Sequence, residues 1–407
     1  MKILILNAGS SSRKCCLYDI ASDALPQTQP APLWKAHADS TRLKVSTSAG
    51  AELEERISSD SDSDSISRVL ETLWSGPTAV LSRPDQIDIV GHRVVHGGRE
   101  YTRPTRIDGE VKAAISRLSP LDPSHNPAAL AGIEAVEKWL GPVPQIAVFD
   151  TAFHSSLPDA AAIYPGPFEW VEQGIRRYGF HGISHGDCAA RAAQILGRDL
   201  HSLHLITCHL GNGCSLCAIR DGKSIDTTMG FTPLEGLMMG TRSGSIDPGI
   251  TLYLLRERGM SAEDLDHILN WESGLKGVSG LSGDMREIAA AIEKGNPRAL
   301  LAFEVYVHRA RAQIGAMLAA LGGLDALVFT GGVGENSAPV RAAICQAFAF
   351  LGLVISPEIN GKSPANQDIS RPESKVRVLV IPAQEDWAIA RECWEWAANS
   401  TKNEAGL

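Results

Sequence analysis

Three stretches of the sequence place glycines and small polar residues directly after an apolar, strand-like run. They are "NAGSSSRK" from Asn7, "HLGNG" from His209 and "FTGGVGENS" from Phe329. Glycine lets the backbone approach a ligand closely, so successive N–H groups can surround an anion. Each stretch alone is more typical of an ordinary turn than of a binding site, but three in one chain favour phosphate binding. The third predicts a helix N-terminus near Asn336 or Ser337, where a phosphate or ribose could lie.

Ionisable side chains lie close to similar stretches. Arg93 in "GHRVVHGG" and Arg242 in "GLMMGTRSGSIDPG" can each bind phosphoryl or carboxylate oxygens bidentately, although either could instead brace a loop. Asp150 in "FDTAFH" follows an apolar run, and His181 in "RRYGFHGISH" lies between an aromatic residue and a glycine. Neither G-x-x-x-x-G-K-[ST] nor a helix-opening G-x-G-x-x-G occurs, so the glycines are not those of the common nucleotide loops.

The elements that must position these residues follow an alternating pattern. Six apolar runs that end in a glycine, polar or charged cluster predict buried strands at 2–6, 87–90, 145–149, 203–208, 325–329 and 376–381. Strands alternating with helices indicate an α/β fold with layered sheets. Ligands of such sheets bind beyond the carboxyl ends of the strands, so we expect the polar clusters to face one cleft.

Capping residues mark the intervening helices. Asn126-Pro127 predicts an N-cap and a first-turn proline for a helix that ends near Gly141, and Asn296-Pro297 predicts a long helix that stops at Gly322-Gly323. Ser184 with Asp187, and Ser261 with Asp264, have the spacing of capping boxes. A last helix is expected around 387–398.

Composition limits the classes of function. A chain of 407 residues with 44% hydrophobic content is long enough for two domains, and a formal net charge of -9 argues against a general nucleic-acid binder. The eight cysteines are scattered, and the one C-x-x-C has no second metal-binding pair, so we expect reduced thiols and no zinc site. The sequence has neither a signal-peptide core nor an apolar run of membrane-spanning length, which predicts a soluble cytoplasmic protein. The acidic, serine-rich residues 56–68 predict a solvated loop.

In order and spacing, seven motifs along nearly the whole chain resemble those of the acetate kinase family of short-chain acyl kinases. They are "NAGSSSRK", "GHRVVHGG", "FDTAFH", "RYGFHGISH", "HLGNG", "FTPLEGLMMGTRSG" and "FTGGVGENS". The resemblance implies the two-domain fold of sugar kinases, Hsp70 and actin, with ribonuclease H-like mixed sheets flanked by helices on either side of a nucleotide cleft. It implies a first domain of residues 1–150, rejoined by a helix at about 386–398, and a nucleotide-binding domain of residues 151–385.

The same resemblance implies reversible, Mg²⁺-dependent phosphorylation of acetate by ATP, with Mn²⁺ as a substitute, in a homodimer. It assigns catalysis to Arg93, Asp150, His181 and Arg242, and metal binding to Asn7 and Glu385. ATP or ADP is expected at Ser12, Lys14, His209, Leu210, Gly211, Asn212, Gly213, Asp284, Met285, Arg286, Gly332, Val333, Gly334, Glu335 and Asn336. The small carboxylate substrate is expected at Arg93, Val95, Ser124, His125, Phe180 and Pro233.

The acyl pocket departs from the family pattern at one position. The family usually has an apolar residue before the histidine of "HNP", whereas Ser124 precedes His125 here. A roomier or wetter pocket keeps a second reading open, that of a propionate or other short-chain acyl kinase. A more remote alternative is an ATP-switched binding protein like Hsp70 or actin, in which hydrolysis drives conformational change.

Overall fold

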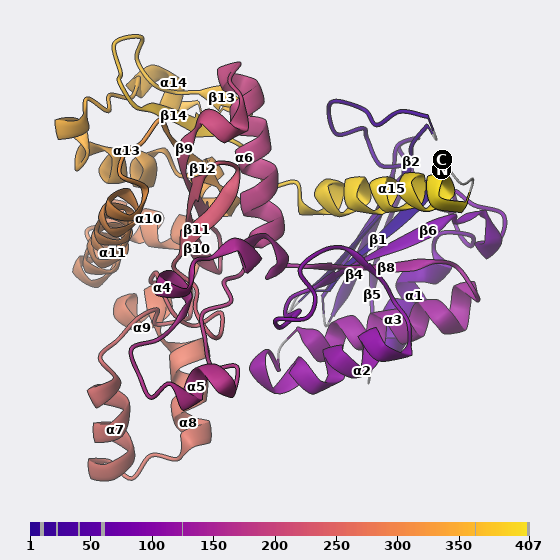
Figure 1. The fold of residues 1–407 in the computed structure, drawn as a ribbon, viewed down its shortest axis with the longest axis horizontal. Helices are drawn as coiled ribbons and strands as arrows, with labels where there is room; N and C mark the ends of the chain where they lie inside the picture. The colour runs from indigo at the N-terminus through magenta and orange to yellow at the C-terminus, as the bar shows by residue number, and fades with distance from the viewer. Residues whose placement is uncertain are drawn as a thin grey trace. The chain divides into compact units, whose positions relative to one another are not determined.

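The computed structural model describes residues 1–8, 12–21, 23–39, 41–57, 62–123, 125–362 and 364–404. Its backbone divides into two compact units. The first comprises Met1–Ala152 together with Gln384–Leu407, and the second comprises Phe153–Ala383. Each unit contains one sheet with helices packed against it (Figure 1).

The sheet of the first unit has the strand order β5-β4-β3-β2-β1-β6-β8-β7. Its strands are β1 (Lys2–Ala8), β2 (Ser12–Asp19), β3 (Trp34–Asp39), β4 (Arg42–Thr47), β5 (Glu52–Arg56), β6 (Ile89–Val94), β7 (Thr105–Arg106) and β8 (Gln145–Phe149). Strands β1, β6 and β8 run parallel, whereas β1 to β5 form an antiparallel meander. The carboxyl ends of β1, β6 and β8 therefore lie at one edge of the sheet.

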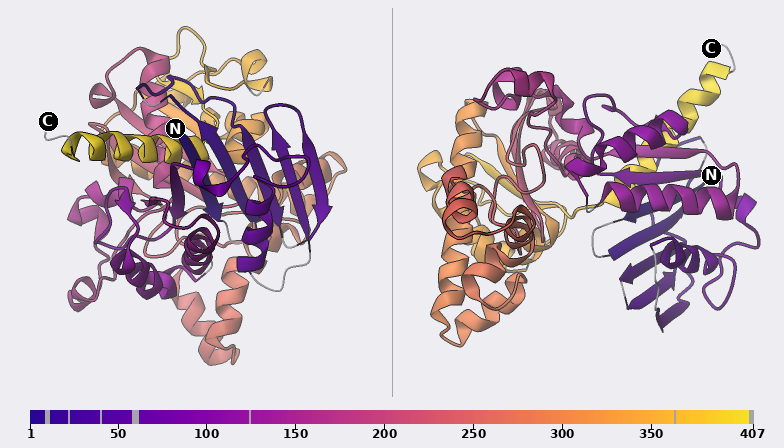
Figure 2. Two further views of the ribbon diagram at one scale, coloured as in Figure 1. Left: turned by 90° about the vertical axis from the view of Figure 1, so that its right-hand side faces the viewer. Right: turned by 90° about the horizontal axis from the view of Figure 1, so that it is seen from below.

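Helices cover both faces of the β1–β6 region of this sheet. On one face lies α15 (Glu385–Glu404), which packs on β1 and β6. On the other face lie α1 (Asp62–Glu71) and α3 (Asn126–Leu140), and α2 (Gly109–Leu118) packs on α3 (Figures 1 and 2). The apolar runs of β1 and β8 are fully buried because they have a helix on each side.

The sheet of the second unit has the strand order β11-β10-β9-β12-β14-β13. Its strands are β9 (His204–Leu210), β10 (Cys214–Arg220), β11 (Lys223–Thr227), β12 (Ala326–Thr330), β13 (Gln367–Asp368) and β14 (Arg377–Val380). One face packs on α6 (Gly182–Leu196), and the other packs on the long helix α11 (Pro297–Leu321) (Figure 1).

The second unit also contains a set of shorter helices. They are α4 (Asp159–Ala162), α5 (Glu169–Glu172), α7 (Pro248–Glu257), α8 (Ala262–His267), α9 (Gly274–Ser279), α10 (Met285–Glu293), α12 (Gly331–Asn336), α13 (Ala338–Gln346) and α14 (Pro357–Gly361). Among the described residues, no helix combines the length and the apolar character that spanning a membrane requires.

Several predictions from the sequence are confirmed. All six apolar runs form strands, and the α/β class with two mixed sheets is correct. Asn296 caps α11 by accepting a hydrogen bond from the Ala299 N–H, and Gly322 ends the helix with a φ of 72°. Ser261 caps α8 by accepting from the Asp264 N–H at 3.0 Å.

Other predictions are wrong. Asn126 is the first residue of α3 rather than its cap, because its side chain bonds both polar backbone groups of His96. Ser184 lies inside α6, where its hydroxyl bonds Nδ1 of His209 instead of capping the helix. The acidic segment is not one loop: Arg56 ends β5 and residues 62–68 begin α1, while residues 58–61 lie outside the described residues.

The glycines after Phe329 also depart from the prediction, because residues 331–336 form the short helix α12 instead of a turn. Gly331 opens this helix with a φ of 77°, and a Cβ there would lie 2.8 Å from the Leu210 carbonyl oxygen. This close approach explains why glycine is needed at that position.

Candidate functional site

The structure places the predicted site residues in both units. The first unit contains Asn7, Ser12, Lys14, Arg93, Val95, His125, Asp150 and Glu385, and the second contains the remaining described ones. Ser124 lies outside the described residues, and Ser12 is described only by its place at the start of β2.

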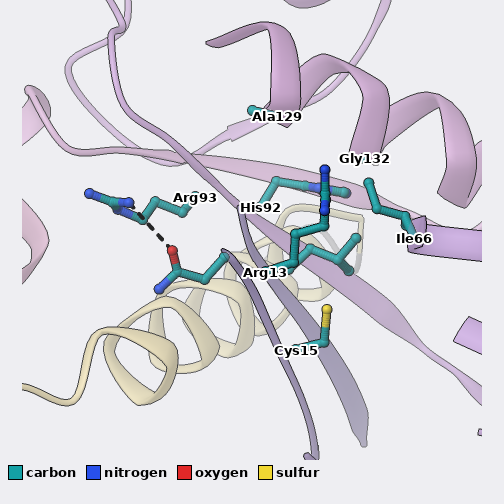
Figure 3. A pocket seen from close by; sticks show the side chains of 9 residues that line it. Arg13, Cys15, Ile66, His92, Arg93, Ala129 and Gly132 are labelled. Carbon is teal, nitrogen blue, oxygen red and sulfur yellow. Dashed lines mark hydrogen bonds between the residues drawn. The ribbon is translucent and has the colours of Figure 1, made fainter. Parts of the chain in front are cut away.

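An arginine–aspartate pair lies at the carboxyl ends of the parallel strands of the first unit. Arg93 on β6 donates from Nη2 and Nε to Oδ2 of Asp150, at 2.5 and 3.1 Å, and Asp150 directly follows β8. The Asp150 side chain is fully buried and that of Arg93 is 11% exposed. Arg93 also donates to Oδ1 of Asn7 at 3.4 Å, a bond drawn in Figure 3 beside a small cavity lined by His92 and Arg13.

Two carboxylates at the start of α15 extend this pair into a network. The Asn7 amide donates to Oε2 of Glu385 at 3.4 Å and to Oδ1 of Asp386 at 3.0 Å. Nε of Arg93 lies 4.0 Å from Oε2 of Glu385. Asn7 therefore links the cation of Arg93 to the two carboxylates of Glu385 and Asp386. Asp386 was not predicted from the sequence, although its place beside Glu385 at a helix start is a usable signal.

Burial and neighbouring charge act in opposite directions in this network. Burial raises the pKa of Asp150 above its usual value and Glu385 adds to the increase, while Arg93 opposes it. Burial would lower the pKa of Arg93, but Asp150 and Glu385 raise it above its usual value. Burial also raises the pKa of Asp386, against the hydrogen bond from Asn7. A buried cation is thus held by nearby carboxylates, the arrangement that a buried charge requires.

The donor set of this network fits a magnesium ion. Oxygen ligands are those that Mg²⁺ prefers, and Oδ1 of Asp150 is buried without a hydrogen-bond partner among the described residues. Within the described residues, no group of three or more His, Cys, Asp or Glu side chains is arranged to hold a metal by itself. In proteins Mg²⁺ is usually bound by one or two carboxylates, and water and substrate phosphates complete its coordination shell.

In the second unit, the hairpin between β9 and β10 forms the predicted glycine turn. Gly211 donates its N–H to the Gly213 carbonyl at 3.0 Å, and Gly240 donates to the Asn212 carbonyl at 3.0 Å. A Cβ on Gly240 would lie 2.3 Å from Oδ1 of Asn212, so only glycine leaves room for that side chain. His209 and Leu210 end β9 just before the turn, and both are buried.

His181 and Arg242 both approach this turn. A Cβ added to Gly213 would lie 3.3 Å from Cε1 of His181 and 3.7 Å from Nη1 of Arg242. The His181 ring stacks on that of His209, with centroids 4.1 Å apart. Arg242 is oriented by a hydrogen bond to the Pro233 carbonyl at 3.1 Å. A cation and an imidazole therefore lie beside a glycine turn, the chemistry expected of a phosphate-binding site.

His181 occupies its position through an unusual backbone conformation. It precedes α6 with a φ of 57°, a left-handed value that few residues other than glycine adopt. Such strain is maintained only where surrounding contacts compensate for it, and it is frequent at functional sites.

The other predicted nucleotide residues lie at helix starts. Asp284 caps α10 and accepts from the Arg286 side chain at 2.5 Å, while Arg286 itself is 90% exposed. Met285 is buried in the first turn of α10. Gly332, Val333, Gly334, Glu335 and Asn336 form α12, which directly follows the central strand β12.

The predicted acyl-pocket residues come from both units and are not equally exposed. Val95 and Phe180 are buried, at 3% and 1% exposure. His125 bonds Oδ1 of Asp122 through Nδ1 at 2.7 Å, and Asp122 was not predicted from the sequence. Pro233 enters the site through its carbonyl, which orients Arg242.

Known proteins resemble this chain along nearly its whole length. The model of the acetokinase family matches residues 2–391. The chain is 61% identical over 402 residues to the acetate kinase of Gloeobacter violaceus, covering 97% of this chain and 99% of that one. It is 62% identical over 400 residues to the acetate kinase of a Nostoc species, with coverages of 97% and 99%.

Solved structures give the same result. The Porphyromonas gingivalis acetate kinase has a TM-score of 0.88 at 40% identity, and a propionate kinase from Francisella tularensis has a TM-score of 0.88 at 37% identity. Each comparison covers 97% of this chain and 99% of the other. Fold and site thus define a phosphotransferase with a small-molecule substrate. The chain belongs to the acetokinase family.

Proposed function

We propose that this protein phosphorylates acetate with ATP, reversibly, giving acetyl phosphate and ADP. The observation that carries this is the convergence of Arg242 and His181 on the glycine turn at 211–213, in a chain of the acetokinase family. In the forward reaction an acetate oxygen forms a bond to the γ-phosphorus, the bond to the ADP oxygen breaks, and that oxygen leaves with its electron pair. Acetate is already an anion at neutral pH, so its attack needs no general base.

The residues then act by positioning and by electrostatics, which are the main needs of phosphoryl transfer. The turn N–H groups and Asn212 bind phosphate, while Arg242, Arg93 and His181 stabilise charge on the phosphoryl oxygens. Asp150 orients Arg93 through its two hydrogen bonds. Bound Mg²⁺ would neutralise phosphate charge, and Asn7 and Glu385 are the residues that would hold it.

A substrate panel tests the proposal. Rates on acetate, propionate and butyrate are measured with hydroxylamine trapping of the acyl phosphate, and we expect kcat/KM to be highest for acetate. A higher value for propionate would replace acetate by propionate, an alternative supported by Ser124 and by the similarity to a propionate kinase. ATP turnover that does not depend on any carboxylate would favour an ATP-switched protein instead.

We also propose that the protein is a homodimer in the cytoplasm. Helix α11 exposes Leu300 and Leu301, at 43% and 49%, and α7 exposes Leu252 and Tyr253, at 48% and 50%. Exposed large apolar side chains of this kind are typical of surfaces that bind another protein chain.

A further inference from the structure

Behind His181 lies a chain of hydrogen bonds that the proposed mechanism does not use. Ser215 on β10 is fully buried, and its Oγ lies 2.9 Å from Nδ1 of His181 and 2.7 Å from Nε2 of His185. Nδ1 of His185 lies 2.7 Å from Oγ1 of Thr207 on β9. His185 and Thr207 are also fully buried. Three hydrogen bonds therefore connect the sheet interior to His181.

The number of protons in this chain restricts how it can be arranged. Burial lowers the pKa of His185 well below its usual value, and His154 and His209 add to the decrease, so His185 is neutral with a single ring N–H. Ser215 has one hydroxyl proton, so it can donate to only one of the two rings and must accept from the other. The proton positions on His181 and His185 are therefore linked.

Thr207 selects between the two possible arrangements. If its hydroxyl donates to Nδ1 of His185, then His185 donates from Nε2 to Ser215, and Ser215 donates to Nδ1 of His181. In the reverse arrangement Thr207 accepts, and its own buried O–H has no acceptor among the described residues. A buried donor without an acceptor is unfavourable, so the first arrangement is favoured.

The first arrangement has a consequence for the opposite edge of the His181 ring. When Nδ1 accepts from Ser215, neutral His181 carries its proton on Nε2. A Cβ added to Gly213 would lie 3.4 Å from this Nε2, so that edge faces the glycine turn. Stacking on His209, which is itself bonded to Ser184 at 2.8 Å, holds the plane of the ring. Phosphoryl oxygens only accept hydrogen bonds, so an N–H at this edge attracts them and a bare nitrogen repels them.

We propose that Ser215 and His185 are positioning residues that hold neutral His181 with its proton on Nε2, as a donor to a phosphoryl oxygen at the 211–213 turn. Neither residue touches the phosphoryl group. The role in turnover rests on the proposed function, whereas the proton position does not.

The first test is the proton position itself. Two-dimensional ¹⁵N spectra of the whole protein, labelled at histidine and assigned with His181→Gln, report which ring nitrogen carries the proton. We expect the Nε2–H form of His181 in the wild type and a mixture of both forms in Ser215→Ala. A neutral His181 protonated on Nδ1 in the wild type overturns the proposal without any variant having to fold, and it does so even if the substrate turns out not to be acetate.

The second test is kinetic and uses a matched control. Ser224 on β11 is equally buried and bonds Nδ1 of His154 at 2.8 Å, so Ser224→Ala removes a similar hydroxyl–imidazole bond that is not one of the three hydrogen bonds joining Thr207 to His181. We expect Ser215→Ala to lower kcat by about 10- to 100-fold, with a smaller change in the KM for acetate. We expect Ser215→Thr to recover much of this loss and Ser224→Ala to keep a normal kcat. Equal kinetic losses in Ser215→Ala and Ser224→Ala, or no loss in Ser215→Ala, contradict the proposal.

Discussion

The two units hold their functional side chains by different means. In the first unit, Arg93, Asp150 and Glu385 form a buried network of full charges. In the second unit, His181 is held by hydroxyl groups and a neutral imidazole, through Ser215 and His185. One site is organised by ion pairs and the other by neutral hydrogen bonds.

This difference determines what happens when one residue is removed. A buried charge that loses its partner remains in a medium that solvates it poorly, which costs about 3–5 kcal/mol. A buried hydroxyl or imidazole that loses its partner costs about 1–3 kcal/mol. Removing a functional residue should therefore lower the free energy of unfolding more in the first unit than in the second.

The largest expected effect compares the two arginines. Arg93→Gln and Arg242→Gln should each lower kcat on the order of 10³-fold or more, because both remove a cation that stabilises the phosphoryl oxygens. Only Arg93→Gln should also lower the free energy of unfolding by about 3–5 kcal/mol, because it leaves Asp150 buried without its cation. Steady-state kinetics and urea unfolding measure the two effects. Equal stability losses in both variants would remove the contrast between the units.

Much of this arrangement was predictable because it depends on local sequence. Arg93 and Asp150 were recognised by their residue types and by their positions at the ends of apolar runs. Their pairing was not predictable, because it requires β6 and β8 to be neighbours in the sheet. Likewise, Asn7 was recognised at the end of β1, but its bond to Asp386 joins residues 379 positions apart.

Two serines show the limit of local patterns. Ser184 and Ser261 have the same spacing to an aspartate, yet only Ser261 caps a helix. At the other position, the left-handed His181 starts α6 three residues earlier, so Ser184 faces His209 instead. The helix at 331–336 was missed for a similar reason, since its glycines fit against the Leu210 backbone, which only the folded sheet provides.

The effect of pH on the free energy of unfolding should be of intermediate size and similar in both units. Burial lowers the pKa of His92 in the first unit and of His154 in the second to about 4. Between pH 6.5 and 4 the unfolded chain binds protons that the native protein does not, so the free energy of unfolding falls as the pH falls through this window. Each histidine contributes a slope that rises from about 0.7 kcal/mol per pH unit at pH 6.5 toward about 1.4 kcal/mol per pH unit near pH 5.5.

Variants of these histidines test whether the units are alike in this respect. His92→Gln and His154→Gln should each reduce the change in the free energy of unfolding between pH 6.5 and 5.5 by about 1 kcal/mol. Urea unfolding at pH 7.5, 6.5 and 5.5 measures it, and the values at pH 7.5 separate the loss of the side-chain hydrogen bond from the effect of protonation. An unchanged slope in either variant would mean that this histidine is not buried neutral in the native state.

The smallest expected effect on stability comes from two helix caps, one a charged carboxylate and the other a neutral hydroxyl. Asp108 caps α2 in the first unit and accepts from the N–H groups of Glu110 and Val111, both at 2.9 Å, whereas Ser261 caps α8 in the second unit and accepts from the N–H of Asp264 at 3.0 Å. Asp108→Ala should cost about 1–2 kcal/mol and Ser261→Ala about 0.5–1 kcal/mol, because the carboxylate also interacts with the helix dipole. Since salt screens a charge but not a neutral hydroxyl, only the loss in Asp108→Ala should shrink when unfolding is measured at about 1 M salt instead of 0.1 M. If the two losses respond to salt alike, the contrast between charged and neutral stabilisation does not extend to the helix caps.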